Sequence, residues 1–353
     1  MHSKKIIIIA GGSGGHVFPA ITIANYLIKH GWKINWIGTK NKIESEIVPK
    51  FNIKMHFIDI YGLKNANLKT LIFSPIYMLK SYFKIKKIIQ NYLPDIVLGM
   101  GGYVSGPGGI AAWSLKIPFI LHEQNKIPGM TNKLLSKIST KNMQAFKGAL
   151  PNAEVVGNPV REDIIKISSP QHRFKNRLGP LRILIIGGSQ GASIFNNILP
   201  KISYFLKSKV SIWHQVGKNE LEKTKKKYKR YSSYQHKITS FIDNIASAYA
   251  WADLIISRSG ALTVSEIITV GIGAIFIPYP HKDKQQLLNA QDLKKNGAAK
   301  IIEQNQFNIE IILKILNSLD RKKLLIMAEK AFSLRTENSI IKIFKIINNI
   351  SKK

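Results

Sequence analysis

The 353-residue chain contains no cysteine, which excludes disulfides and thiolate metal sites and fits a reducing compartment. It has no apolar run near the roughly 18 residues that a membrane-spanning helix needs. The early apolar run, Ile6 to Ala10, is short and ends in glycines without a cleavage-type pattern. It therefore predicts a first buried strand rather than a signal peptide.

Acidic residues are scarce, with 20 Asp and Glu against 53 Lys and Arg and a net charge of +33. Such an excess attracts polyanions: nucleic acid, anionic lipid or a phosphorylated substrate. The lysines are spread along the chain, and no nucleic-acid-binding module is visible. We interpret the excess as compositional bias in preference to a nucleic-acid site.

The dinucleotide-binding pattern G-x-G-x-x-G is also missing, although two segments come close to it. Ile6 to Ala10 leads into Gly-Gly-Ser-Gly-Gly-His, and Arg182 to Ile186 leads into Gly-Gly-Ser-Gln-Gly-Ala. Each predicts a strand, a glycine turn and a helix, which opens a doubly wound α/β domain. The next predicted strand, Ile34 to Ile37, ends in Gly38 and Thr39, where a dinucleotide enzyme needs a carboxylate for the ribose. Nicotinamide and flavin enzymes are therefore disfavoured.

Two such openings predict an α/β protein of two Rossmann-like domains, with a cleft between the carboxyl ends of their sheets. A length of 353 residues with 45% hydrophobic content suits two cores. The polar stretch that follows Val160 is the best linker candidate. We predict domains at 1–160 and 161–336, with a basic amphipathic helix at about 337–351 packing back on the first.

The rest of the chain is organised around Ser257 to Ala290. A short apolar strand precedes the turn Ser259-Gly260, and helix-forming residues begin at Ala261. The free N–H groups and positive dipole at such a helix start suit a phosphate. Glu266, one turn further in, suits ribose hydroxyls, and the later amides of Gln285, Gln286 and Asn289 suit sugar hydroxyls. The segment predicts a nucleotide-sugar site; the alternative is an ordinary strand–turn–helix with a solvated loop.

The segment from Asn67 to Tyr92 carries more apolar residues than one helix face needs, interrupted by Pro75 and edged by lysines. This pattern is typical of a helix in a membrane interface beside anionic headgroups. A core-packed helix with lysines extending to solvent explains it equally well.

Several motifs occur in a fixed order along the chain: GGSGGHVFPA, GGYVSGPGG, HEQN, GNPVR, GGSQGA, SRSGALTVSE and HKDKQQLLNA. Together, from roughly Ile6 to Ala299, they resemble the MurG family of bacterial N-acetylglucosaminyltransferases of peptidoglycan synthesis. The resemblance implies the two-Rossmann-domain GT-B glycosyltransferase fold. It also implies transfer of GlcNAc from UDP-GlcNAc to undecaprenyl-pyrophosphoryl-MurNAc-pentapeptide (lipid I to lipid II), with inversion at the anomeric carbon.

The same resemblance implies a peripheral protein on the cytoplasmic face of the bacterial inner membrane, whose first domain binds the acceptor and faces the membrane. It implies no cofactor, and as partners the two substrates, the anionic membrane surface and other cell-wall synthesis proteins, without nucleic acid. A related GT-B transferase with another lipid acceptor, such as a galactosyldiacylglycerol synthase, is the nearest alternative. A basic nucleic-acid-binding protein is the alternative from another class.

The site residues follow from the motifs that match. The implied donor-binding residues are Ser13, Gly14, Gly15, Asn125, Arg161, Ser189, Ile242, Ala261, Leu262, Thr263, Val264, Ser265, Glu266 and Gln286. The family usually has threonine where this chain has Ser13, so the hydroxyl is retained and a methyl group is lost.

For catalysis, an acceptor hydroxyl must lose its proton as it attacks the anomeric carbon. His16 titrates near neutrality and is our first choice as general base, with Glu123 second; His16 as a structural cap of the glycine loop is the alternative. No Asp-x-Asp pair occurs in the chain, so we predict no metal bound by protein side chains.

The lipid acceptor predicts a membrane-facing surface on the first domain. We expect it to lie within the segment from Asn67 to Tyr92. The residues expected to insert are Phe73, Ile76, Tyr77 and Phe83, with Lys80, Lys84 and Lys87 on the headgroups.

Overall fold

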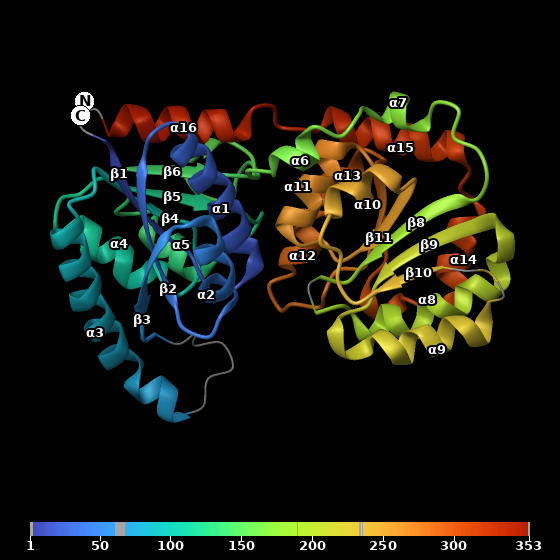
Figure 1. Cartoon of the computed structure of the whole chain (residues 1–353), viewed down its shortest axis with the longest axis horizontal. Helices are drawn as coiled ribbons and strands as arrows, with labels where there is room; N and C mark the ends of the chain where they lie inside the picture. The colour runs from blue at the N-terminus through green and yellow to red at the C-terminus, as the bar shows by residue number, and fades with distance from the viewer. Residues whose placement is uncertain (1–2, 61–67, 189, 233, 235, 352–353) are drawn as a thin grey trace. The chain divides into compact units, whose positions relative to one another are not determined.

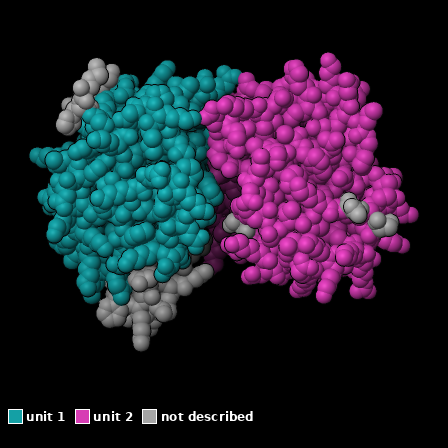
Figure 2. Space-filling model, in the orientation of Figure 1, with its two compact units in different colours: residues 1–160, 336–353 teal, residues 161–335 magenta. Residues whose placement is uncertain are grey.

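The computed structural model describes residues 3–60, 68–188, 190–232, 234 and 236–351, with the side chains of helix α3 described from Ser74 onward (Figure 1). The chain divides into two compact units (Figure 2). Unit 1 comprises residues 1–160 and 336–353, and unit 2 comprises residues 161–335.

Unit 1 is built on a parallel sheet in the order β3-β2-β1-β4-β5-β6-β7. Its strands are β1 (Lys5–Ile9), β2 (Lys33–Thr39), β3 (Lys54–Ile58), β4 (Ile96–Gly99), β5 (Phe119–Glu123), β6 (Lys141–Gln144) and β7 (Glu154–Val155). The central strand β1 is almost continuously apolar because helices cover both faces of the sheet.

The two faces of this sheet have separate cores. Ile6 and Ile8 point to the face covered by α1 (Gly14–Lys29), α2 (Ile43–Ile47), η1 (Val48–Phe51) and α16 (Ser339–Ile350). Ile7 and Ile9 point to the face covered by α3 (Leu68–Tyr92), α4 (Ser105–Ser114) and α5 (Met130–Leu135). The period-2 alternation of a strand thus distributes four isoleucines between two cores.

The last helix of the chain, α16, belongs to unit 1 and packs on α1. Its Ile343 and Ile347 are completely buried in the first core. The Nζ of Lys4 donates hydrogen bonds to Asn348 Oδ1 (2.9 Å) and to Ser351 Oγ (3.0 Å). Side chains at the two ends of unit 1 are thereby joined.

Unit 2 has a second parallel sheet, in the order β10-β9-β8-β11-β12-β13. Its strands are β8 (Leu181–Ile186), β9 (Val210–Gln215), β10 (Lys237–Thr239), β11 (Leu254–Ser257), β12 (Gly273–Phe276) and β13 (Ala299–Ile301). The longer helices around it are α8 (Ser193–Leu206), α9 (Leu221–Tyr231), α11 (Ala261–Val270), α14 (Ile309–Asn317) and α15 (Arg321–Ser333). Shorter ones are α6 (Glu162–Ile165), α7 (Pro170–Phe174), η2 (Lys207–Lys209), η3 (Lys218–Glu220), α10 (Ile245–Trp251), α12 (Gln285–Asn289), α13 (Gln291–Lys295) and η4 (Gln304–Gln306).

Both sheets reverse their strand order at one place, between β1 and β4 in unit 1 and between β8 and β11 in unit 2. In open parallel α/β sheets, ligands bind beyond the carboxyl ends of the strands at such a switch point. The glycine-rich loop follows β1 in one unit and β8 in the other. The predicted pair of Rossmann-like sheets is confirmed, and its topology places both glycine loops where ligands are expected.

Candidate nucleotide-sugar site

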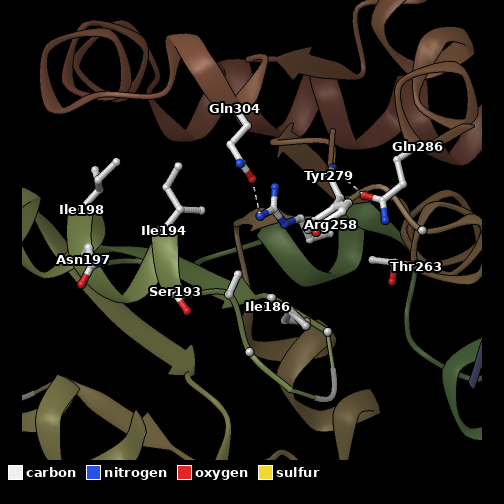
Figure 3. A pocket seen from close by; sticks show the side chains of 15 residues that line it. Ile186, Ser193, Ile194, Asn197, Ile198, Arg258, Thr263, Tyr279, Gln286 and Gln304 are labelled. Carbon is white, nitrogen blue, oxygen red and sulfur yellow. Dashed lines mark hydrogen bonds between the residues drawn. The ribbon is translucent and has the colours of Figure 1, made fainter. Parts of the chain in front are cut away.

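A cavity of about 830 Å³ lies at the switch point of unit 2 (Figure 3). Three parts of the chain contribute to it: the loop after β8 with the start of α8, the β11–α11 turn, and the segments that follow β12 and β13. Among its described lining residues Arg258 is the one formal charge. The lining comprises Ile186, Gly187, Gly188, Gly191, Ala192, Ser193, Ile194, Asn197, Ile198, Arg258, Gly260, Thr263, Tyr279, Gln286 and Gln304.

The first turns of two helices, α8 and α11, meet at this cavity. Gly260 is the N-cap of α11 and has no side chain to satisfy the N–H groups of the first turn. Gly191 has a φ of +74°, and a Cβ there would collide with the carbonyl group of Val216, so glycine is needed for this close approach. Because helix N-termini carry a partial positive charge, the arrangement suits a diphosphate.

Glu266 lies one turn further into α11 and is 7% exposed. Its Oε2 accepts a hydrogen bond from the hydroxyl of Tyr249 (2.8 Å), and its Oε1 lies 3.8 Å from Nη2 of Arg161. Burial raises the pKa of Glu266 to about 7, although Tyr249 and Arg161 both pull it down and Asp163 adds to the rise. The carboxyl group is held in place and titrates near neutrality.

Several residues of unit 2 that the sequence analysis predicts to bind the donor lie on or next to these elements. Ala261, Leu262, Thr263, Val264 and Ser265 form the first turns of α11. Gln286 is the second residue of α12 and accepts a hydrogen bond at Oε1 from the N–H of Tyr279 (2.9 Å). Arg161 is the N-cap of α6, which packs on α11. Ser189 lies outside the described residues.

The predicted base-binding turn follows β10. Ile242 is buried, and Asn244 caps α10 by accepting from Ser247 N–H (2.9 Å). An open hollow of about 570 Å³ lies beside this turn. It is lined by Asp163, Ile167, Asp243, Asn244, Ala246, Ser247 and Ala250.

In unit 1 the glycine loop after β1 carries Ser13, Gly14 and Gly15, the last two already in the first turn of α1. Ser13 Oγ lies 3.1 Å from Nδ1 of His16. A second glycine-rich loop, with Gly101 and Gly102, follows β4. A Cβ on Gly102, whose φ is +77°, would come within 2.8 Å of the Gly11 carbonyl oxygen, so this loop contacts the glycine loop after β1. Half-buried His16 packs against this junction; burial lowers its pKa, opposed by a hydrogen bond to the Gly11 backbone and by the charge of Glu44. A neutral imidazole at pH 7 is able to accept a proton.

Glu123, the second candidate base, is 1% exposed and accepts four hydrogen bonds. The donors are Asn125 N (2.9 Å), Asn125 Nδ2 (3.3 Å), Gly129 N (3.3 Å) and Asn132 Nδ2 (2.7 Å). Burial raises the pKa of Glu123, and these donors lower it. The arrangement orients Asn125, the predicted sugar-binding amide.

Glu44, at the start of α2, is a residue of this site that the sequence analysis missed. Its fully buried carboxylate accepts from Gly12 N (3.1 Å) at one oxygen and from Thr39 N (3.1 Å) and Thr39 Oγ1 (2.7 Å) at the other. The sequence of this five-residue helix does not indicate that the Glu44 side chain points to the glycine loop.

Helix α3 has one apolar face buried in the core and another apolar face that is exposed; whether the exposed face contacts a membrane stays a prediction. Ile85 and Ile89 are buried in the core under α4, whereas Ile76 is 49% and Phe83 58% exposed. Tyr77 is half-buried, Lys80, Lys84 and Lys87 are exposed, and the side chain of Phe73 lies outside the described residues. Further exposed apolar side chains that the sequence analysis did not select lie on α3 and on the neighbouring α4 and α5: Leu79, Trp113, Met130 and Leu134.

The described part of the chain contains neither a bilayer-spanning helix nor a metal-binding cluster of side chains. Within it, no helix combines the length and the hydropathy that crossing a bilayer requires. Nor do these residues include a group of three or more His, Cys, Asp or Glu side chains arranged to hold a metal ion.

Comparisons with known proteins agree with this geometry. Residues 6–144 match the glycosyltransferase family 28 N-terminal domain and residues 182–343 its C-terminal domain. The UDP-N-acetylglucosamine--N-acetylmuramyl-(pentapeptide) pyrophosphoryl-undecaprenol N-acetylglucosamine transferase of Buchnera aphidicola subsp. Schizaphis graminum is 72% identical over the full length of both chains. Its counterpart from Buchnera aphidicola subsp. Acyrthosiphon pisum (strain Tuc7) is 67% identical over the same span.

Among solved structures, MurG of Acinetobacter baumannii superposes with a TM-score of 0.86 at 35% identity, covering 98% of this chain and 99% of that one. The UDP-GlcNAc 2-epimerase of Neisseria meningitidis, solved with UDP-GlcNAc, has a TM-score of 0.67 at 14% identity, covering 98% and 100%, which shows a shared fold alone. The predicted GT-B fold is confirmed.

Proposed function

The chain belongs to the MurG family of glycosyltransferases, and from that membership we propose that it transfers GlcNAc from UDP-GlcNAc to undecaprenyl-pyrophosphoryl-MurNAc-pentapeptide. The product is lipid II, the disaccharide-bearing lipid of peptidoglycan synthesis. The observation that carries the proposal is the 72% identity over the whole chain to a relative with that activity in its name. The cavity of unit 2, where the N-termini of two helices meet, supports a nucleotide-sugar donor, as does the buried carboxyl group of Glu266 one turn further along α11.

In the proposed complex, unit 2 holds the donor. The diphosphate lies at the starts of α8 and α11 beside Ser189 and Arg161, and the ribose hydroxyls donate to Glu266. The backbone of Ile242 binds the uracil. Gln286 and Asn125 bind hydroxyl groups of the sugar, and Ser13, Gly14 and Gly15 approach the sugar and phosphates.

The reaction is a displacement at the anomeric carbon. The acceptor hydroxyl oxygen forms a bond to that carbon as the bond to the β-phosphate oxygen breaks, with the electron pair leaving on UDP. His16, neutral at pH 7, accepts the hydroxyl proton; Glu123 remains the second candidate. The positive ends of α8 and α11 stabilise the charge that develops on the departing diphosphate.

The acceptor is anchored in a bilayer, so the protein must work at a membrane surface. The exposed face formed by Ile76, Leu79 and Phe83 on α3 is the proposed contact, with Lys80, Lys84 and Lys87 near anionic headgroups. Trp113 on the neighbouring α4 extends the same kind of surface. We expect a peripheral protein at the inner face of the cell membrane.

The test is a transfer assay with radiolabelled UDP-GlcNAc and either a lipid I analogue or diacylglycerol in mixed vesicles. The proposal expects label in the lipid I product alone, with the new glycosidic bond inverted relative to the donor. Label in diacylglycerol would favour the related transferase with another acceptor. No transfer to either lipid by a folded protein that binds UDP would contradict the proposal.

A further inference from the structure

Arg258 lies in the β11–α11 turn, and its guanidinium group is held from several sides (Figure 3). Nη1 donates to the carbonyls of Ile277 (2.9 Å) and Pro278 (3.2 Å), and Nη2 donates to Oε1 of Gln304 (2.7 Å). The guanidinium carbon also lies 5.1 Å from the ring centroid of Phe195 and 5.4 Å from that of Tyr279. The planar fork of arginine is engaged by protein groups before any ligand arrives.

Arg258 binds the carbonyls of the two residues that directly follow β12. Ile277 still donates its N–H to Ser257 O (2.9 Å), which extends the pairing with β11 by one residue. Beyond it, Pro278 and Pro280 have no N–H to give, so the backbone of this loop has few donors of its own. Arg258 therefore supplies hydrogen bonds that a sheet would otherwise provide.

The next N–H along this loop sets the orientation of Gln286. Tyr279 N donates to Gln286 Oε1 (2.9 Å), which engages the oxygen of that amide. Figure 3 shows the amide nitrogen of Gln286 turned away from Tyr279, and Gln286 lines the cavity. An amide whose oxygen is engaged in this way presents its NH₂ group to a ligand as a donor.

We propose that Arg258 is a positioning residue: by fixing the backbone at Ile277 and Pro278 it places Tyr279 N–H, which orients the Gln286 amide as a hydrogen-bond donor to the sugar of UDP-GlcNAc. The inference rests on the proposed function, in which Gln286 binds GlcNAc. It predicts that Arg258 acts on the difference in affinity between UDP-GlcNAc and UDP, since UDP has no sugar for Gln286 to bind. An arginine that bound the diphosphate directly would act on both ligands equally.

The decisive variant is Arg258→Lys, which keeps the positive charge at the cavity and loses the planar fork. Calorimetric titration is expected to show UDP-GlcNAc affinity reduced about tenfold, the loss of about one hydrogen bond, with UDP affinity within about twofold of the parent. Gln304→Ala removes only the hydrogen-bond partner of Arg258 Nη2. It should also weaken UDP-GlcNAc binding without weakening UDP binding, but by a smaller factor. It also serves as the test if Arg258→Lys does not fold.

Gln286→Ala is the matched control, and Arg258→Lys/Gln286→Ala completes a double-mutant cycle. Because both residues act through one amide, the double variant should bind UDP-GlcNAc no more weakly than Gln286→Ala alone. Additive losses would overturn the inference, as would equal losses of UDP and UDP-GlcNAc affinity in Arg258→Lys, or no loss at all. If Gln286→Ala alone leaves the affinity for UDP-GlcNAc unchanged, Gln286 does not bind the sugar and the inference is wrong. The proposed function is tested separately, because the labelled assay measures transfer to lipid I.

Discussion

The two glycine loops share a sequence pattern and a place in the topology, yet their surroundings differ. The loop after β8 opens onto the cavity of unit 2, which no carboxylate lines among the described residues. The loop after β1 is held by other parts of unit 1, because Glu44 accepts the N–H of Gly12 and His16 packs against Gly101 and Gly102 of the loop after β4. In unit 2 the glycine loop lines a cavity, whereas in unit 1 a protein carboxylate already accepts one of the loop N–H groups. The same glycine pattern at a switch point can therefore line a cavity, as in unit 2, or contact a buried carboxylate of the protein, as in unit 1.

We propose that proton transfer takes place in unit 1, at His16, and the largest expected effect tests that proposal. His16→Ala should reduce turnover by about 10²- to 10⁴-fold, because the acceptor hydroxyl loses its general base. Steady-state transfer at saturating donor and acceptor measures it. Turnover within a fewfold of the parent would remove His16 from this role, and Glu123→Gln then becomes the next variant to assay.

The second comparison is between the lysines of α3 in unit 1 and those of α9 in unit 2. Reversing Lys80, Lys84 and Lys87 to glutamate should weaken binding to anionic vesicles by about a hundredfold or more at low salt, since each lysine contributes about 1 kcal/mol near such a surface. The loss should shrink as salt rises. Vesicle flotation measures it.

A matched control uses Lys223, Lys226 and Lys229, which are exposed on α9. Their reversal changes the net charge equally and should leave flotation nearly unchanged. If both triple variants lose binding alike, the whole basic surface is responsible and α3 has no special role.

The third prediction concerns pH. The pKa of Glu266 is raised to about 7 by burial, so its carboxylate becomes protonated as pH falls through 7. Ribose hydroxyls donate to the ionised form, so UDP-GlcNAc affinity should fall by up to about tenfold between pH 8 and pH 6. Glu266→Gln should bind more weakly and lose most of this dependence. An equal pH slope in that variant would assign the titration to another group.

The smallest expected effect tests the contact between Glu44 and the glycine loop of unit 1. Glu44→Gln replaces an acceptor oxygen by an NH₂ group facing Gly12 N–H or Thr39, and an unsatisfied buried group costs about 1–3 kcal/mol. For a unit of this size the melting temperature should fall by roughly 2–10 °C. UDP affinity should not change, because the donor cavity lies in unit 2. A melting temperature equal to that of the parent would show that Glu44 does not hold the loop.

Regular patterns made much of this protein predictable from its sequence. Apolar strands followed by glycines predicted both sheets, and the Ser257–Ala290 segment predicted the turn and helix on which Glu266 lies. Contacts between distant segments were not predictable in this way. Tyr249 reaches Glu266 from a different helix, Glu44 turns back to Gly12 across 32 residues, and Arg258 reaches Gln304 across 46.

Helix α3 shows why the sequence left two alternatives open. A core face and a membrane face both require apolar side chains, so the same residue types occur on both. Packing against α4 identifies the core face by burying Ile85 and Ile89, and it leaves Ile76 and Phe83 exposed, so their membrane contact stays a prediction.

The most direct test of the account is the affinity of UDP for Glu266→Ala and His16→Ala, measured by calorimetry under one set of conditions. Charge-assisted hydrogen bonds are worth roughly 1.5–3 kcal/mol each, so Glu266→Ala should bind UDP at least about tenfold more weakly than the parent. His16→Ala, altered in the other unit, should bind within about twofold. Equal affinities in the two variants, or a greater loss in His16→Ala, would contradict the assignment of UDP binding to Glu266 in unit 2.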